Sequence, residues 1–266
     1  MKRVLLIFSF FITSCVVEAQ ILIGPTVGLN YSWVTFGDKD YNHYYNVKPV
    51  LGFSGGINLS FRVRKRFFLH SSFIYSQKGK IVEGKVDTDL KNKSINNYIE
   101  IPILYTAEFK IKLKGNKEYK VYLGAGPNIS YWLGGKGTFY NSELHEANVG
   151  PRHYKIAFNK NFDQIGDTEM GVEQPNRIQL GLNLSAGLVF EPIPGKEVML
   201  TLRYELGHTY AGRSTQGGTL SDITLYTDNL QVRNQGFRIS LAYLFDLRTD
   251  QRKKGKSTSK IKKKMS

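Results

Sequence analysis

The sequence predicts an all-β fold, an eight-stranded antiparallel up-and-down transmembrane β-barrel, and three observations predict it. Apolar residues alternate with small or polar residues in eight segments, which is the two-residue period of strands that are apolar on one face. The links between these segments are alternately short and long, which is typical of an up-and-down barrel. After the first 20 residues, no apolar run approaches the roughly 18 residues that a membrane-spanning helix needs.

The first 19 residues are predicted to be a signal peptide. Lys2 and Arg3 precede an apolar stretch, and small residues before Gln20 suit cleavage by a signal peptidase. A second interpretation remains open, because the segment 12–15 also fits a lipobox, which would leave a lipidated cysteine. Both interpretations place the mature chain outside the cytoplasm. This cysteine is the only one in the chain, which excludes a disulfide framework and a Cys-based zinc site.

The first four predicted strands are Ile21–Trp33, Val47–Val63, Phe67–Gln77 and Asn97–Leu113. The second alternates over about 16 residues, far beyond the usual 5–6 of a globular strand, as a tilted membrane-spanning strand requires. The residues predicted to face lipid share one parity in each strand. They include Ile23, Val27, Leu29, Tyr31, Leu51, Phe53, Ile57, Leu69, Phe73, Ile99, Ile101, Ile103 and Tyr105.

The last four predicted strands are Tyr119–Leu133, Ile178–Phe190, Val198–Leu206 and Phe237–Phe245. Their apolar faces carry almost no charge, which suits lipid, and their other faces carry Gly, Ser and Asn, which suit a narrow lumen. The alternative is a soluble barrel with its apolar face around a ligand, which would need a charged exterior. The residues predicted to face lipid include Leu123, Ile129, Leu180, Leu182, Leu184, Leu200, Leu202, Ile239 and Leu241.

The links define two ends of the predicted barrel. The short links are 64–66, 114–118 and 192–197, and the long links are 35–46, 78–96, 134–177 and 207–236. An even strand count places both mature termini in the periplasm and the long links outside the cell. Within the longest link, alternation at Tyr154, Ile156 and Phe158 is expected to extend strands above the membrane. A ten-stranded barrel that recruits 153–162 and 222–231 is the alternative.

Aromatic residues are predicted to form a belt at each membrane interface, where amphipathic rings prefer to lie. The outer belt is Tyr31, Trp33, Tyr75, Tyr131 and Tyr204, and the inner belt is Phe61, Phe67, Phe109, Tyr119, Phe190 and Phe245.

Four motifs resemble the PorT-like outer-membrane β-barrel family of Bacteroidota. They are Gly28-Leu29-Asn30, Tyr98 to Pro102, Gly124 to Pro127 and Leu202 to Gly207, and the likeness covers residues 20–246. The resemblance implies an eight-stranded barrel in the outer membrane. For the family's namesake it also implies a part in type IX secretion. The long link at 134–177 and the basic C-terminus depart from the compact pattern of that family.

Five charged residues are predicted to point into the lumen: Glu100, Glu108, Arg203, Glu205 and Arg238. An eight-stranded barrel has an interior only wide enough for side chains, so these charges must pair. A salt-bridged plug is the expected arrangement, and a gated channel is the alternative. His70 is also predicted to point inward, as a histidine with satisfied hydrogen bonds rather than a metal ligand.

The C-terminal residues 247–266 are predicted to form a basic, disordered periplasmic tail. This tail contributes much of the net charge of +15, and its basic residues include Arg252, Lys253, Lys254, Lys256, Lys260, Lys262, Lys263 and Lys264. The expected partner is a periplasmic anionic polymer or an acidic protein, and nucleic acid is not expected.

The expected function is a non-enzymatic structural or binding role in the outer membrane, with no cofactor and no metal. The chain has no phosphate-binding loop, no H-E-x-x-H and no G-x-S-x-G motif. Its expected contacts are outer-membrane lipid and an extracellular ligand at the 134–177 link. A secretion component, a small pore and a rim enzyme are the alternatives. The enzyme would use Asp38, Asp40, His43, His208 and Asp222.

Overall fold

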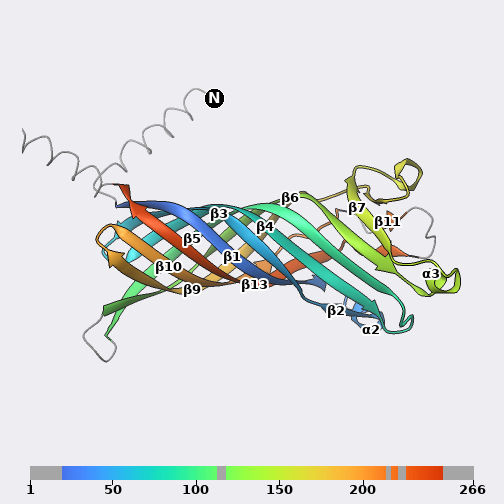
Figure 1. Cartoon of the computed structure of the whole chain (residues 1–266), viewed down its shortest axis with the longest axis horizontal. Coiled ribbons are helices and arrows are strands. Elements are labelled where there is room, and N and C mark those ends of the chain that lie inside the picture. Colours follow the sequence, from blue (N-terminus) through green and yellow to red (C-terminus); the bar gives the residue numbers. More distant parts are fainter. Residues whose placement is uncertain (1–19, 113–117, 214–216, 221–225, 248–266) are drawn as a thin grey trace, which may run out of the picture.

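The computed structural model describes residues 20–112, 118–213, 217–220 and 226–247. Eight long strands form an elongated barrel (Figure 1). They are β1 (Ile21–Phe36), β3 (Val50–Arg64), β4 (Phe67–Gly84), β5 (Lys91–Lys112), β6 (Glu118–Tyr140), β9 (Ile178–Ile193), β10 (Lys196–Gly207) and β13 (Val232–Asp246). Each pairs antiparallel with the next long strand, and β13 pairs with β1, so the ring is closed.

The ring register fixes the tilt of the barrel. Paired positions followed once around the ring lead from Tyr31 through Leu184 and Tyr105 to Phe61 and back to Ile21. The register therefore shifts by ten residues, which is about 33 Å along a strand. Over eight strands about 4.8 Å apart, this shift corresponds to a tilt of about 40°, within the range of outer-membrane barrels.

The direction in which residues face is confirmed on all eight strands. Residues of the apolar parity are exposed on the outside of the ring, for example Leu51 at 71%. Residues of the other parity are buried in the lumen, among them Asn30, Ser60, Thr106 and Asn183. The exposed apolar side chains form a continuous band over Val27, Leu29, Phe53, Ile57, Phe73, Ile101, Leu123, Ile129, Leu180, Leu184, Leu202, Ile239 and Leu241.

Ring contacts join predicted belt residues across strands at both edges of this band. At the outer edge Trp33 contacts Tyr204, with 6.5 Å between ring centroids, and Tyr31 and Phe237 join this group. At the inner edge Tyr119 contacts Phe190 at 5.7 Å, and Phe67 stacks on Tyr105. Contacts of this geometry suit rings that lie at a membrane interface.

The chain forms thirteen strands in the described residues, not eight, and the five additional strands are short and lie outside the ring. They are β2 (Tyr45–Lys48), β7 (Arg152–Phe158), β8 (Glu169–Val172), β11 (Gly218–Leu220) and β12 (Thr227–Asp228). The helical turns α2 (Tyr41–Tyr44), α3 (Ser142–Glu146) and η1 (Phe162–Gln164) accompany them. No helix of the described chain is long and apolar enough to cross a membrane. The ten-stranded alternative is wrong, because β7 and β12 do not enter the ring.

The predicted link 78–96 is mostly strand. β4 continues to Gly84 and β5 begins at Lys91, so only six residues connect them. Ile99 pairs with Tyr75 and Tyr131 of the outer belt, so β5 continues for eight residues, about 26 Å along the strand, beyond this belt. The apolar alternation ends here because most outward positions of β5 are polar, at Lys91, Lys93 and Asn97.

We call the part of the structure beyond the outer belt the extension; Figure 1 shows it at the end of the barrel opposite the first residues of β1. β7 pairs with the upper part of β6, as the alternation at Tyr154 predicts, and runs parallel to β8. A hydrophobic core holds these elements together: Leu90, Phe139, Leu144, Tyr154, Met170, Leu220 and Tyr226. The extension is therefore a folded structure with its own core.

Candidate functional site

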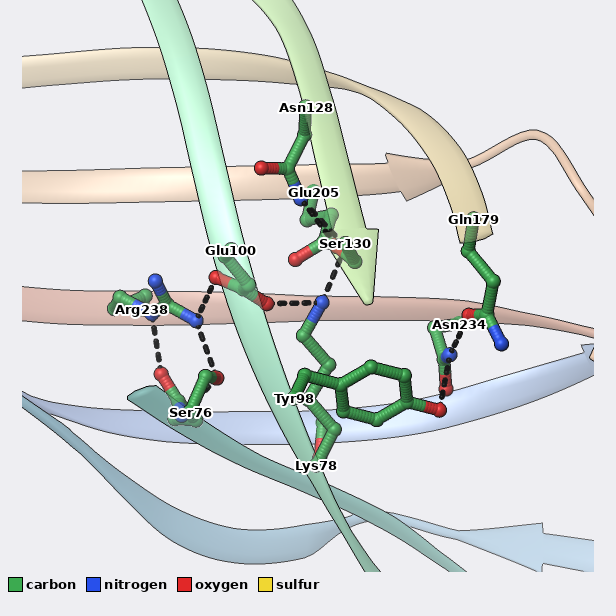
Figure 2. A network of polar contacts seen from close by, with 12 residues as sticks. Ser76, Lys78, Tyr98, Glu100, Asn128, Ser130, Gln179, Glu205, Asn234 and Arg238 are labelled. Atoms are coloured by element: carbon green, nitrogen blue, oxygen red, sulfur yellow. Dashed lines mark hydrogen bonds and ion pairs between the residues drawn. The ribbon is translucent and has the colours of Figure 1, made fainter. Parts of the chain in front are cut away.

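A cluster of buried charges fills the lumen beside the outer belt (Figure 2). Glu100 of β5 is 0% exposed and lies at its centre. The Nζ of Lys78 forms an ion pair with Glu100 and a second with Glu205 Oε1, at 2.5 Å. Arg238 Nη2 lies 2.6 Å from Glu100 Oε2, and Arg203 Nη2 lies 3.8 Å from the same oxygen. Three cations therefore surround two carboxylates.

Hydrogen bonds connect this cluster to strands around the ring. Arg238 Nε donates to Asn30 Oδ1 of β1 at 2.5 Å, and its Nη2 donates to Ser76 Oγ of β4 at 2.6 Å. Asn30 Nδ2 donates to the Phe53 carbonyl oxygen of β3 at 3.2 Å, and Asn128 Nδ2 of β6 donates to Glu205 Oε1 at 3.2 Å. Such a network fixes each charged side chain in one geometry, which a buried ion pair needs in order to offset its desolvation.

A second branch of the network reaches β9. Lys78 Nζ lies 5.2 Å from the centroid of the Tyr98 ring, as in a cation–π contact. The Tyr98 hydroxyl accepts from Asn234 Nδ2 at 3.1 Å, and the same amide donates to Gln179 Oε1 of β9 at 2.8 Å. Together the two branches connect all eight strands of the ring.

Four of the five predicted lumen charges meet in this cluster, and Glu108 does not. Glu108 lies eight residues further along β5, about 26 Å away, where it lines a cavity with Arg62, Lys65 and Lys120 at the inner end of the barrel. Lys78, which joins the two carboxylates, lies one residue beyond the predicted end of the third strand at Gln77 and is not among the predicted lumen charges. The sequence pattern could have identified it, because Lys78 follows Ser72 and Ser76 at an even spacing and therefore points to the same inward face of the strand.

Apolar layers close the lumen on both sides of the charges. On the outer side Tyr98 and Trp132 pack with Val34, Val172, Ala211, Leu230 and Val232. At the inner end the layer consists of Leu22, Tyr122, Val189, Met199, Ala242 and Leu244. Two cavities in the described lumen have volumes of about 10 Å³ beside Arg203 and about 20 Å³ beside Trp132. Each has room for about one water molecule, so neither forms a channel.

His70 points into the lumen as predicted, and the expected hydrogen bonds are not made to described protein atoms. Its ring is 5% exposed and lies between Phe68 and Tyr122, with centroid distances of 6.0 and 5.8 Å. Neither ring nitrogen has a hydrogen-bond partner among the described atoms. Burial of an unpaired polar group costs free energy, so His70 contributes its packing and not its polarity.

We expect His70→Leu to raise the free energy of unfolding by about 1 kcal/mol, because it removes two unpaired polar atoms and keeps the apolar contacts. A urea titration in lipid vesicles, followed by the fluorescence of Trp33 and Trp132, measures this change. The exposed His208 provides the control, because His208→Leu should change stability by less than about 0.5 kcal/mol. A clear loss of stability in His70→Leu would show that the imidazole has a hydrogen-bonded role.

The candidate residues of the rim enzyme that the structure describes lie in two segments of the chain. Asp38, Asp40 and His43 lie at or beside α2, and His208 lies just after β10. No hydrogen bond or ion pair between His208 and the other three is present in the described residues, and Asp222 lies outside them. The predicted signal peptide and the tail residues Arg252, Lys253, Lys254, Lys256, Lys260, Lys262, Lys263 and Lys264 also lie outside them.

A comparison with protein families agrees with a barrel. A family model described as "Outer membrane protein beta-barrel domain" matches residues 18–209. No curated protein matches the chain. Among solved structures, OprG of Pseudomonas aeruginosa is 10% identical, with a TM-score of 0.43, over 86% of this chain and 96% of OprG. Neisserial surface protein A is 12% identical, with a TM-score of 0.38, over 86% of this chain and 99% of that protein. Ail of Yersinia pestis is 14% identical, with a TM-score of 0.34, over 84% of this chain and 98% of Ail.

Proposed function

Because the chain belongs to the outer membrane protein β-barrel domain family, we propose that its barrel is a closed anchor and its extension a binding surface outside the cell. The protein is an outer-membrane β-barrel protein. The observation that carries the proposal is the extension itself, which continues about 26 Å along β5 beyond the outer belt and has its own hydrophobic core. An anchor alone would not need a folded structure of this size above the membrane.

The 134–177 link supplies much of this surface. It comprises the end of β6, α3, β7, η1 and β8, which pack on the extension through Phe139, Leu144 and Tyr154. Ordered, packed loops lose little conformational entropy when they bind a partner, so they favour recognition. This supports the extracellular ligand site that the sequence analysis assigned to this link.

We expect the purified protein to show no stable single-channel conductance in a planar bilayer. The ion pairs of Lys78 with Glu100 and Glu205, and the apolar layers on both sides, occupy the lumen of the described barrel, which supports a barrel closed to ions. A porin of known conductance, reconstituted in the same bilayer, is the positive control. Regular steps that disappear when the protein is omitted would favour the small-pore alternative instead.

The proposed orientation can be tested with a cysteine at the far end of the extension. Val86 is 82% exposed in the β4–β5 turn, and Lys65 lies in a short turn at the opposite end of the barrel. A membrane-impermeant maleimide should label Val86→Cys on intact cells and should label Lys65→Cys only after the outer membrane is broken. The reverse pattern would contradict periplasmic termini and the proposed function together.

A part in type IX secretion is the second candidate, carried by the PorT-like motifs. Three of these motifs supply residues of the charge cluster: Asn30, Tyr98 with Glu100, and Arg203 with Glu205. The motifs therefore support a shared barrel interior more directly than a shared partner. Deletion of the gene, with secreted cargo measured in the medium, separates the two candidates. A loss of secretion that the wild-type gene restores would favour the secretion component.

We also propose that the protein is not an enzyme and that its basic tail associates with an anionic periplasmic partner. The non-enzymatic proposal is supported by the sequence, which contains no H-E-x-x-H and no G-x-S-x-G motif. The tail proposal is supported by the excess of Lys and Arg in residues 247–266. An association through exposed charges should weaken as salt is raised, because such charges are screened beyond about 8–10 Å at physiological ionic strength.

A further inference from the structure

The extension contains a pocket at its far end, between α2 with β2 and the turn that joins β4 to β5. Figure 1 shows α2 and β2 at this end. We call it the tip pocket, and its chemically distinctive lining residues are Asp38, Asp40, Tyr41, Tyr44, Tyr45 and Asp87. Its volume is about 600 Å³, within the 300–1,000 Å³ that is usual for small-molecule sites.

Aromatic rings form one wall of the tip pocket. Tyr41 stacks on Phe36 with a centroid distance of 5.3 Å and on Tyr45 at 5.8 Å. Tyr44 is 58% exposed, and Val86 in the β4–β5 turn is also exposed. The stacked rings hold this wall in place, while exposed apolar surface remains available to a ligand. Tyrosine faces attract cations as well as apolar groups.

Three carboxylates line the same pocket, and hydrogen bonds fix two of them, Asp87 and Asp38. Asp87 Oδ1 accepts from the backbone N–H of Asp89 at 3.0 Å and of Leu90 at 3.2 Å, and its Oδ2 accepts from Ser142 Oγ at 3.0 Å. Asp38 Oδ1 accepts from the backbone N–H of Asp40 at 2.9 Å. These bonds orient the carboxylates before any ligand arrives.

The tip pocket carries negative charge. Its lining contains no Lys and no Arg among the described residues. The neighbouring Lys85 does not line the pocket; its Nζ donates to the Asn42 carbonyl oxygen of α2 at 2.7 Å. The pKa of Tyr45 is raised, first by burial and then by Tyr41, Asp228 and Asp87, as expected for a phenol in a negative field.

This lining favours an organic cation over a metal ion. In the described part of the chain, no group of three or more His, Cys, Asp or Glu side chains could hold a metal. The carboxylates border an aromatic and aliphatic wall, so they match a ligand with a charged head and an apolar stem. Recognition of an ammonium group by aromatic faces and a nearby carboxylate is a recurrent use of the cation–π interaction.

We propose that the tip pocket binds a primary ammonium group on an aliphatic stem. The ammonium group lies between the Tyr faces and Asp38, Asp40 and Asp87, and the stem packs on Val86 and Leu90. This proposal rests on the proposed function, since it names the class of ligand that the extracellular surface recognises. The ammonium group can come from a lysine side chain of a partner protein or from a free aliphatic amine.

The test is a binding titration with the full mature protein in lipid nanodiscs, by isothermal calorimetry. The probes are N-acetyl-lysine methylamide for a protein side chain, cadaverine for a free amine, and N-acetyl-norleucine methylamide as the uncharged control. We expect both ammonium probes to bind and the uncharged probe to bind at least about tenfold more weakly. Tighter binding of the lysine amide indicates a protein partner, and tighter binding of cadaverine indicates a free amine. Equal binding of the uncharged control, or no binding of either amine, would overturn the proposal.

Variants locate the binding site. The double variant Asp38→Asn with Asp40→Asn should lower the affinity for the ammonium probes by about tenfold. The exposed control Asp163→Asn, in η1, should leave this affinity unchanged. Tyr44→Leu should lower the affinity for the ammonium probes by about fivefold, whereas Tyr44→Phe keeps the aromatic face and should leave this affinity unchanged. Unchanged affinity in both the Asp and the Tyr44→Leu variants would refute this site. If maleimide labels Val86→Cys on intact cells but the amines do not bind, only this inference fails and the proposed function stands.

Discussion

Replacing Glu100 with Gln is expected to lower the free energy of unfolding by about 3–5 kcal/mol, the cost of breaking a buried ion pair by removing one partner. Glu100 is fully buried and forms ion pairs with Lys78, Arg238 and Arg203. Without it, three cations in the lumen face only Glu205. The side chain of Gln has nearly the same size, so the loss would report charge and not packing.

A urea titration in lipid vesicles, followed by tryptophan fluorescence and by heat-modifiable mobility on a gel, measures this effect. Glu191→Gln is the matched control. Glu191 lies 3.8 Å from Lys120 and is largely exposed, so its loss should cost less than about 1 kcal/mol.

Adding Arg238→Met to Glu100→Gln should restore part of the lost stability, because Glu100 is the carboxylate with which Arg238 pairs in the described residues, whereas Lys78 keeps its ion pair with Glu205. The double-mutant cycle isolates the coupling between the two side chains. Equal stability of Glu100→Gln and the wild type would mean that the cluster does not hold the lumen together.

Replacing Leu184 with Arg is expected to cost about 2–4 kcal/mol, as for a cation on the lipid-facing side of a barrel at the bilayer midplane. Leu184 is 45% exposed and lies on the outside of β9. It is six residues from Ile178, which pairs with Tyr131 of the outer belt, and six from Phe190 of the inner belt. The side chain is therefore close to the middle of the apolar band.

Ile193→Arg on the same strand is the control for Leu184→Arg. Ile193 is 50% exposed and lies beyond Phe190, where an arginine should cost only about 0–1 kcal/mol. The folded fraction of each variant in lipid vesicles, measured by heat-modifiable mobility, compares the two positions. Equal folding of both variants would contradict the proposed position of the membrane.

The sequence by itself determined which residues face outward, and therefore the barrel. A strand reverses its side chains at every residue, so Leu184 and Ser185 must lie on opposite faces wherever the strand is placed. Lipid accepts only the apolar face, and this fixes the register of each strand. The same alternation is sufficient to place four charged residues in the lumen without any knowledge of their contacts: Glu100, Arg203, Glu205 and Arg238.

Only the tertiary structure decided which of these charges meet. The ten-residue shift of the ring register places residues of β4, β5, β10 and β13 at one level, and no single segment contains that shift. It brings Lys78 to Glu100 and Glu205 and leaves Glu108 at the other end of β5. The extension could not be predicted from apolar alternation either, because strands outside the membrane need no apolar face toward lipid. The tip pocket joins residues about 45 positions apart, such as Asp40 and Asp87, and only folding places them together.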